Sequence, residues 1–368
     1  MKLLRWCKAN AMPVIAVLAA AVTAVFVPPD AAYLGYYDVK TLSCLLCVLA
    51  VVGALRRVGL FPLLAQRLVQ VFHTTRGAVT ALVGITLVGS MLLTNDTALL
   101  TFLPLSWFVL ERTGQTKWTA LTFILQNCAA NLGGMLTPFG NPQNLYLASA
   151  FSLSTGTFLI RMFPLTALSL VLLVAAACML PSTPVDIASQ TAAERPEPKK
   201  LAVYLVLFMT CLGCVSHLIP YPVMLVLVLI TLLFINRTLF QKADYFLLLT
   251  FVFFFLFIGN VQNIPAVSDL LHKLIRGREL GAGILLSQCI SNVPAAILLS
   301  GFTDQVIPLL YGVNIGGLGT LIASLASLIS YRFYVGTENA HTGRYMKVFT
   351  LYNVIFLVIL ALVAWKIL

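Results

Sequence analysis

Long apolar runs, separated by short polar segments, dominate the chain. A helix needs about 20 mainly apolar residues to cross a bilayer. Runs of this kind lie near residues 11–28, 39–55, 118–150, 156–180, 201–219, 222–235, 245–261, 305–331 and 348–368. This pattern predicts an all-α, polytopic membrane protein.

Two further apolar stretches, 77–110 and 280–302, are interrupted by polar residues at their centres. The first contains TNDTA at 94–98 and the second contains SNVPA at 291–295. Irregular backbone at membrane depth is tolerated only where protein buries it or water reaches it. We therefore predict two re-entrant hairpins that turn at these residues, enter from opposite faces and meet near the membrane centre.

One long polar tract divides the chain. It reads STPVDIASQTAAERPEPKK at 182–200, and its Pro, Ser and charged residues are typical of a solvated linker. We expect two halves, 1–181 and 201–368, joined by this linker in the cytoplasm. Each half would contain a hairpin followed by a broken helix, near 118–150 in the first half and near 305–331 in the second.

Matching residues recur in the same order in the two halves. The paired segments are Asp38 to Gly53 with Asp244 to Gly259, Ser90-x3-Thr94-Asn95 with Ser287-x3-Ser291-Asn292, and NLGGMLTPFGNPQN (131–144) with NIGGLGTLIASLAS (314–327). An amphipathic stretch follows the first segment of each half, at 60–72 and at 265–275. In the expected topology the run at 39–55 crosses inward and the run at 245–261 crosses outward. The repeats are therefore inverted, an arrangement that places a transporter's substrate site at the repeat interface.

Basic residues determine the expected orientation. Cytoplasmic loops carry an excess of Lys and Arg, and this rule places the N-terminus and the linker inside the cell. Three basic residues precede the first apolar run, which we interpret as an uncleaved span of a protein in the bacterial inner membrane. One cluster disagrees with the rule, because KLIRGR at 273–278 would face outside.

Composition supports the membrane class and excludes others. Of all residues 60% are hydrophobic and 10% are charged, whereas a soluble chain is about half apolar and about a quarter charged. The net charge of +11 is scattered between apolar runs, so we expect no nucleic-acid partner. No HExxH, GxSxG or P-loop sequence occurs, so we do not expect an enzyme. Two CxxC pairs, at 44–47 and 211–214, are conceivable thiolate metal sites, but we interpret them as small apolar residues of membrane helices.

The hairpin tips offer two kinds of ligand. After each turn the second arm begins as a helix, whose free N–H groups and partial positive charge suit an anion. The side-chain oxygens of Thr94, Asn95, Ser291 and Asn292 could instead bind sodium, a hard cation that prefers oxygen. Both ligands can share one cavity.

The broken helices and one carboxylate add to this candidate site. Gly residues in both blocks, together with Pro138 and Pro142 in the first, would unwind the helix there. Broken helices indicate a transporter's binding site, although a kinked helix that packs through small residues is the structural alternative. Asp96 is the carboxylate expected deep in the membrane. It could carry a coupling proton, contribute to a sodium site or cap the second arm of the hairpin.

At these residues the chain resembles the ion transporter superfamily, which includes divalent anion/sodium symporters, citrate permeases and arsenite permeases. The resemblance covers roughly 35–335 without the linker, is closest to short bacterial anion permeases, and implies homodimers with an elevator-type mechanism. We expect from it a substrate site formed by Thr94, Asn95, Asp96, Thr97, Asn141, Pro142, Ser291, Asn292, Val293, Pro294 and Ser324. The sodium ligands that it implies are Ser90, Thr94, Asn95, Gly140, Ser287, Asn292 and Ala323.

The tips also depart from the symporter pattern. TNDT at the first tip is closer to the Asn-Asp pattern of arsenite permeases, and SNVP at the second lacks the Ser-Asn-Thr triplet of the symporters. We expect a secondary active transporter of a small inorganic or organic anion, with di- and tricarboxylates among the candidates. Sodium or protons would be the coupling ion, without any other cofactor. The alternatives are an arsenite or oxyanion efflux permease and a sodium/proton antiporter.

Overall fold

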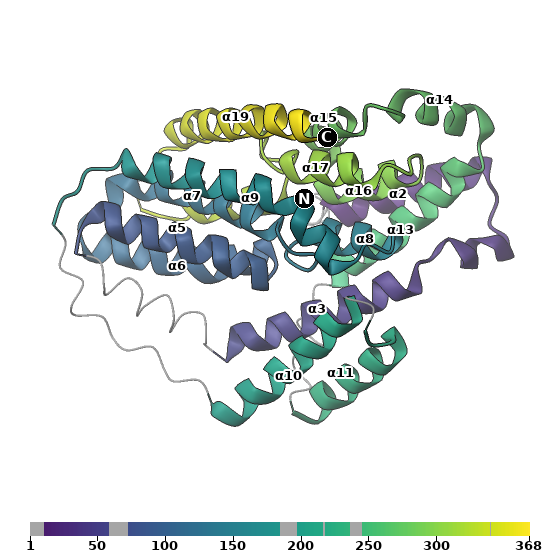
Figure 1. The fold of residues 1–368 in the computed structure, drawn as a ribbon, viewed down its shortest axis with the longest axis horizontal. Coiled ribbons are helices and arrows are strands. Elements are labelled where there is room, and N and C mark those ends of the chain that lie inside the picture. The colour runs from purple at the N-terminus through teal and green to yellow at the C-terminus, as the bar shows by residue number, and fades with distance from the viewer. Residues whose placement is uncertain (1–10, 59–72, 185–196, 216–217, 236–244, 339) are drawn as a thin grey trace, which may run out of the picture.

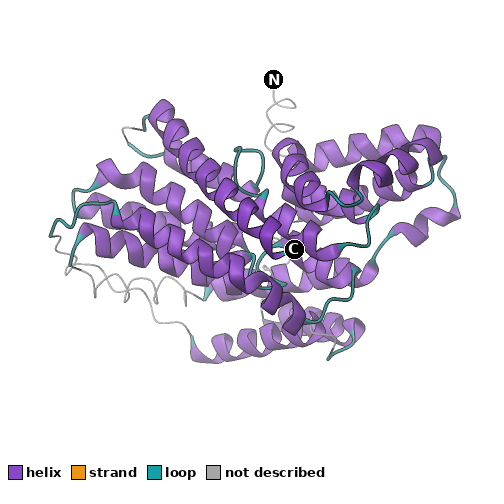
Figure 2. Cartoon of the chain, turned by 45° about the horizontal axis from the view of Figure 1, so that its top comes forward, coloured by secondary structure: helices purple, strands orange, loops and turns teal. Residues whose placement is uncertain are grey.

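The computed structural model describes residues 11–58, 73–184, 197–215, 218–235, 245–338 and 340–368. These residues are almost entirely helical, as the apolar pattern predicts (Figure 1, Figure 2). The elements are α2 (Ala11–Phe26), η1 (Ala31–Tyr36), α3 (Val39–Arg57), α5 (Thr75–Leu92), α6 (Asn95–Arg112), η2 (Thr116–Trp118), α7 (Thr119–Gly134), α8 (Pro142–Ala150), α9 (Thr155–Cys178), α10 (Pro198–Val215), α11 (Tyr221–Ile235), α13 (Tyr245–Gln262), α14 (Pro265–Ile275), α15 (Glu279–Ile290), α16 (Asn292–Ser300), α17 (Val306–Ile315), α18 (Leu325–Val335) and α19 (Thr342–Ile367). The amphipathic stretch at 60–72, Asp244 and most of the predicted linker lie outside the described residues.

The long apolar helices are of membrane-spanning size. Among the described residues, four helices (α5, α9, α10 and α19) are long and apolar enough to cross a bilayer alone. α13 and α14 together form a further apolar unit that bends by 100° at the break between them. Other apolar helices, such as α3 and α11, are shorter.

Both predicted hairpins are present, and the backbone conformation at the turn differs between them. Between α5 and α6 the extended backbone of Leu93 and Thr94 interrupts the helix, and Thr94 Oγ1 accepts a hydrogen bond from the Thr97 N–H. This is N-capping by a threonine, which favours a new helix start at this point. Between α15 and α16 only Ser291 intervenes. Its backbone φ is 76°, in a region that residues other than glycine rarely adopt.

Both broken helices are confirmed. In the first repeat α7 ends at Gly134 and α8 begins at Pro142, while in the second repeat α17 ends at Ile315 and α18 begins at Leu325. Proline is favoured in the first turn of a helix because the N–H that it lacks has no partner there anyway. The segment between each pair of half-helices contacts the hairpin tip of its own repeat.

The two repeats exchange packing partners. Within its own repeat α5 packs against α7, and α15 packs against α17. Across the repeats α6 packs against α18, and α16 packs against α8. Figure 1 shows α5 and α6 on the left of the molecule, whereas α15 and α16 lie nearer its centre. This exchange of packing partners agrees with two equivalent repeats that pack on each other.

Both described ends of the predicted linker belong to the ordered fold. The Thr75 N–H donates to the Thr183 carbonyl at 2.9 Å, and Arg76 Nε donates to the Leu180 carbonyl at 2.8 Å. At the other end, residues 198–200 already form the first turn of α10. The division of the chain into 1–181, 182–200 and 201–368 stays a prediction.

Candidate functional site

The two hairpin tips meet around Asn131, a buried residue of α7. The Oδ1 atom of Asn131 accepts hydrogen bonds from Asn95 Nδ2 at 3.2 Å and from Ser324 Oγ at 2.8 Å. A Cβ atom on Gly317 would lie 2.9 Å from Asn292 Nδ2 and 3.5 Å from Asn131 Oδ1. Residues from both hairpins and from both broken helices therefore share one buried region, which we call the tip region.

Each tip is attached to the broken helix of its own repeat by the same hydrogen bond. The Asn95 N–H donates to the Gly140 carbonyl at 3.1 Å, and the Asn292 N–H donates to the Ala323 carbonyl at 3.0 Å. The four residues occupy equivalent positions in the two matched segments. The sequence repeat therefore corresponds to equivalent atoms in space.

A serine one turn before each tip packs directly on a glycine of the broken helix. A Cβ atom on Gly133 would lie 2.4 Å from Ser90 Oγ, and one on Gly316 would lie 2.7 Å from Ser287 Oγ. Both hydroxyls donate to carbonyls of their own helices, at 2.8 Å and 2.6 Å respectively. Only glycine leaves room for this contact between hairpin and broken helix.

Two hydrogen bonds cross reciprocally between the repeats. Ser324 of the second repeat donates to Asn131 of the first at 2.8 Å, and Asn141 Nδ2 of the first donates to Asn314 Oδ1 of the second at 3.4 Å. Asn131 is equivalent to Asn314 in the repeat, and Asn141 is equivalent to Ser324. The tip region thus lies where the two repeats exchange partners.

The first repeat contributes more amide groups to this region than the second. Asn314 Nδ2 donates to Asn144 Oδ1 at 2.6 Å, and Gln143 Nε2 donates to Asn314 Oδ1 at 3.4 Å. The buried oxygens Asn141 Oδ1 and Gln143 Oε1 accept no hydrogen bond from any described residue. Buried acceptors of this kind are usually satisfied in native proteins, so these two oxygens are candidates to accept hydrogen bonds from a ligand or water.

Four helices begin at the tip region. The N-terminus of α6 is capped by Thr94, but no side chain caps α8, α16 or α18. Each helix N-terminus carries a partial positive charge. No Lys or Arg is among the buried side chains of the described residues. An anion bound here would therefore be stabilised mainly by helix ends and amide groups.

The remaining predicted site residues lie in the first turns of these helices. Asp96 and Thr97 are half-buried on α6, and Asn95 Oδ1 accepts from the Asp96 N–H at 2.8 Å. Val293 is half-buried and Pro294 is buried on α16. The N-cap of α6 is Thr94, and the role of Asp96 stays a prediction. Pro142 occupies the first turn of α8.

Four amide residues were missed as candidates, although all lie in the matched blocks. They are Asn131, Gln143, Asn144 and Asn314. Asn131 and Asn314 occupy equivalent positions at the start of the two blocks, so the repeat could have identified them. Their orientation toward the hairpins is a property of the tertiary structure.

Acidic, histidine and cysteine side chains do not form a metal centre in the described part of the chain. A sodium site here would therefore use hydroxyl, amide and carbonyl oxygens. The CxxC residues of α3 and α10 are buried, with Cys44 Sγ 3.7 Å from Cys214 Sγ. Their packing agrees with the interpretation as small apolar residues between helices.

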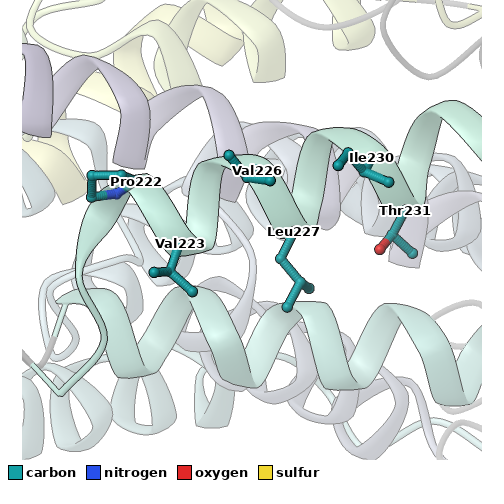
Figure 3. Close-up of a pocket in the computed structure, with 6 residues that line it drawn as sticks. All are labelled: Pro222, Val223, Val226, Leu227, Ile230 and Thr231. Atoms are coloured by element: carbon teal, nitrogen blue, oxygen red, sulfur yellow. The ribbon is translucent and has the colours of Figure 1, made fainter.

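A shallow groove on α11 lies apart from the tip region. Apolar side chains form most of its lining, in which Thr231 is the one polar residue (Figure 3). Its lining residues are Pro222, Val223, Val226, Leu227, Ile230 and Thr231. Because Val226 and Ile230 are half exposed on a short, strongly apolar helix, this groove is apolar rather than suited to a polar substrate.

Comparison with known proteins also indicates a membrane transporter. A family model described as a citrate transporter (CitMHS) matches residues 3–306. The Uncharacterized transporter MJ0456 of Methanocaldococcus jannaschii is 31% identical over 329 residues, which cover 87% of this chain and 88% of that protein. The inner membrane protein YbiR of Escherichia coli is 33% identical over 320 residues, covering 84% and 82%.

Two more distant proteins extend the comparison. The silicon efflux transporter LSI3 of Oryza sativa subsp. japonica is 33% identical over 128 residues, which cover 34% of this chain and 26% of that protein. The crystal structure of the YdaH transporter of Alcanivorax borkumensis has a TM-score of 0.55 at 11% identity and covers 96% of both chains. This likeness to YdaH shows a shared fold.

Proposed function

Because the chain belongs to the citrate transporter family and is a multi-pass membrane transporter, we propose that it carries a small anion by secondary active transport. The substrate would bind in the tip region, with sodium or protons as the coupling ion. The observation that carries this proposal is the reciprocal pair of hydrogen bonds from Ser324 to Asn131 and from Asn141 to Asn314. These bonds bring the helix starts of both repeats to one buried place.

The charge balance of this region supports coupling to a cation. A buried anion is costly unless hydrogen bonds and opposite charge compensate it. The uncapped ends of α8, α16 and α18 supply part of that compensation. A sodium ion or a proton that enters with the anion would supply the rest. We place sodium beside each tip, at the oxygens of Ser90, Thr94, Asn95 and Gly140 and at those of Ser287, Asn292 and Ala323.

Di- and tricarboxylates are the first substrates to test, because the matching family model is described as a citrate transporter. Efflux of an oxyacid is the second candidate. It is favoured by the similarity to a silicon efflux transporter and by the unpartnered oxygens of Asn141 and Gln143. Such oxygens would accept hydrogen bonds from the O–H groups of an undissociated oxyacid.

The test is uptake of labelled citrate, succinate, arsenite and silicic acid by proteoliposomes, with sodium and pH gradients imposed separately. We expect Asn95→Ala and Asn292→Ala to reduce transport at least about tenfold, because each removes a side chain that a charged ligand would contact. Asn263→Ala is the matched control, since Asn263 lies at the corner between α13 and α14 and bonds to Tyr36. Normal transport by both tip variants would refute the site.

The same vesicles separate the alternatives. Sodium-dependent pH changes without any organic or oxyacid substrate would identify a sodium/proton antiporter. Accumulation that depends on an imposed gradient and saturates with substrate would exclude a channel. We further propose that the chain forms homodimers and that the hairpins and broken helices move together as an elevator, as the superfamily resemblance implies.

A further inference from the structure

α14 carries an apolar stripe that the rest of the described protein leaves uncovered. The helix lies at the edge of the molecule, joined to the end of α13 (Figure 1). Ile275 is buried and Leu271 packs partly against the core. On the neighbouring side Leu270 and Leu274 are 55% and 51% exposed, and Val267 is 39% exposed.

The exposed apolar residues form one continuous surface. Positions 267, 270 and 274 follow the i, i+3, i+7 spacing that puts side chains on one face of a helix. These three residues lie beside the face of α14 that packs on the protein. The apolar surface of α14 therefore extends beyond the part that the protein covers. Because α14 bends by 100° away from α13, it runs along the membrane surface if α13 crosses the bilayer.

Three basic residues border this stripe. Lys273 lies in the last turn of α14, and Arg276 and Arg278 follow directly. All three are exposed, and none forms a salt bridge with a described residue. Asp269 is the single acidic residue on the helix. The positive charge is therefore concentrated at the C-terminal end of α14 and directly after it, next to the apolar stripe.

α14 is also connected to both ends of the second hairpin. The His272 ring packs edge-on against Phe302, just beyond α16, with ring centroids 5.4 Å apart. Glu279, the first residue of α15, accepts hydrogen bonds from the Gly277 N–H and from Thr303 Oγ1, each at 3.0 Å. The position of α14 is thus linked to the hairpin that carries Asn292.

We propose that α14 and the basic residues after it form a binding site for anionic phospholipid of the surrounding bilayer. The stripe of Val267, Leu270 and Leu274 inserts at the boundary between headgroups and acyl chains, as amphipathic interfacial helices do. Lys273, Arg276 and Arg278 hold the phosphate groups of anionic lipids. Bound lipid then holds α14 in place, and through it the start of α15, and so influences the movement of the second hairpin.

The experiment measures lipid binding, so it does not depend on knowing the transported substrate. The full-length protein is reconstituted in phosphatidylcholine nanodiscs with roughly one third phosphatidylglycerol, and retained lipids are identified by native mass spectrometry. The test variant is Lys273→Gln/Arg276→Gln/Arg278→Gln. The control variant, Arg332→Gln/Arg344→Gln/Lys347→Gln, loses the same charge from exposed positions elsewhere.

We expect the wild type and the control to retain phosphatidylglycerol in preference to phosphatidylcholine. Each basic residue near an anionic surface is worth roughly fivefold in binding, so the test variant should lose about 100-fold in phosphatidylglycerol affinity. Equal retention by the test variant and the wild type would overturn the proposal, as would a wild type without lipid preference. Leu270→Ser/Leu274→Ser should weaken retention of both lipids, and unchanged retention would refute the role of the apolar stripe.

Discussion

At the scale of single residues, the contact between hairpin and broken helix depends on the absence of a side chain. Gly133 and Gly316 occupy equivalent positions in the two repeats, and each faces the serine that precedes a tip. A Cβ on Gly133 would also lie 2.2 Å from the Leu87 carbonyl, which is backbone and cannot rotate away. The spacing of hairpin and broken helix is therefore determined by glycine.

We expect Gly133→Ala to lower the free energy of unfolding by about 1–3 kcal/mol, since overpacking forces the backbone to shift. Gly316→Ala should act in the same direction. Thermal unfolding in detergent measures both effects. Gly84→Ala is the control, because a Cβ at Gly84 on α5 would meet nothing within 4 Å. Equal stability of the Gly133 and Gly84 variants would contradict the argument.

Ser291 is the residue at which strain is expected to be stored. Its φ of 76° and ψ of 154° lie in a region that glycine adopts at low cost. Ser291→Gly should raise the free energy of unfolding by about 1 kcal/mol, whereas Ser291→Ala removes the hydroxyl and keeps the strain. If Ser291→Ala is as stable as Ser291→Gly, relief of backbone strain does not explain the gain in stability. Denaturant unfolding distinguishes the two.

At the scale of elements, each hairpin is held by helices of both repeats. The second arm of each hairpin packs on a half-helix of the other repeat, since α6 packs against α18 and α16 packs against α8. A direct side-chain bond accompanies the second of these contacts: Tyr146 OH of α8 and Ser300 Oγ of α16 lie 2.7 Å apart. The hairpins and broken helices are therefore expected to be stable as one unit.

A double-mutant cycle measures this coupling. Tyr146→Phe and Ser300→Ala should each destabilise the protein by about 1 kcal/mol, and the double variant should lose clearly less than the sum, with a coupling of about 0.5–1.5 kcal/mol. Unfolding free energies in one detergent give all four corners of the cycle. Strictly additive effects would show that the bond does not join the two elements.

At the scale of the whole molecule, the helices outside the repeats' hairpins form their own close contacts. α3 packs against α10 and α11, and Cys44 Sγ of α3 is 3.7 Å from Cys214 Sγ of α10. A disulfide requires an S–S distance of about 2.05 Å, so the two sulfurs have to move closer together before the bond forms. This pair reports whether α3 and α10 stay together during transport.

We expect a mild copper–phenanthroline oxidant to form the Cys44–Cys214 disulfide, removing two alkylatable thiols as counted by mass spectrometry. Transport by the oxidised protein should continue, because the helices that would move are the hairpins and broken helices. Cys44→Ser treated with the same oxidant is the control. Loss of transport only when both cysteines are present would show that the α3–α10 contact has to change during the cycle.

The sequence predicted the helical content, the two hairpins and the two broken helices. It could do so because a membrane chain must satisfy its backbone within each segment, so local polarity alone marks spans and breaks. TNDTA and SNVPA were recognisable as tips for this reason. The internal repeat added the pairing of Asn95 with Asn292, since equivalent positions in two copies need no knowledge of the fold.

The tertiary structure decided what these positions contact. Asn131 and Asn314 became the centre of the tip region because helices far apart in the sequence pack together, and a local pattern carries no information on such pairing. The cap of α6 by Thr94 and the uncovered stripe of α14 depend in the same way on backbone geometry and on neighbours. The sequence by itself therefore determined which segments are apolar helices and where those helices break, because polarity and helix breakers are local, and only packing across the repeats determined which polar atoms face one another.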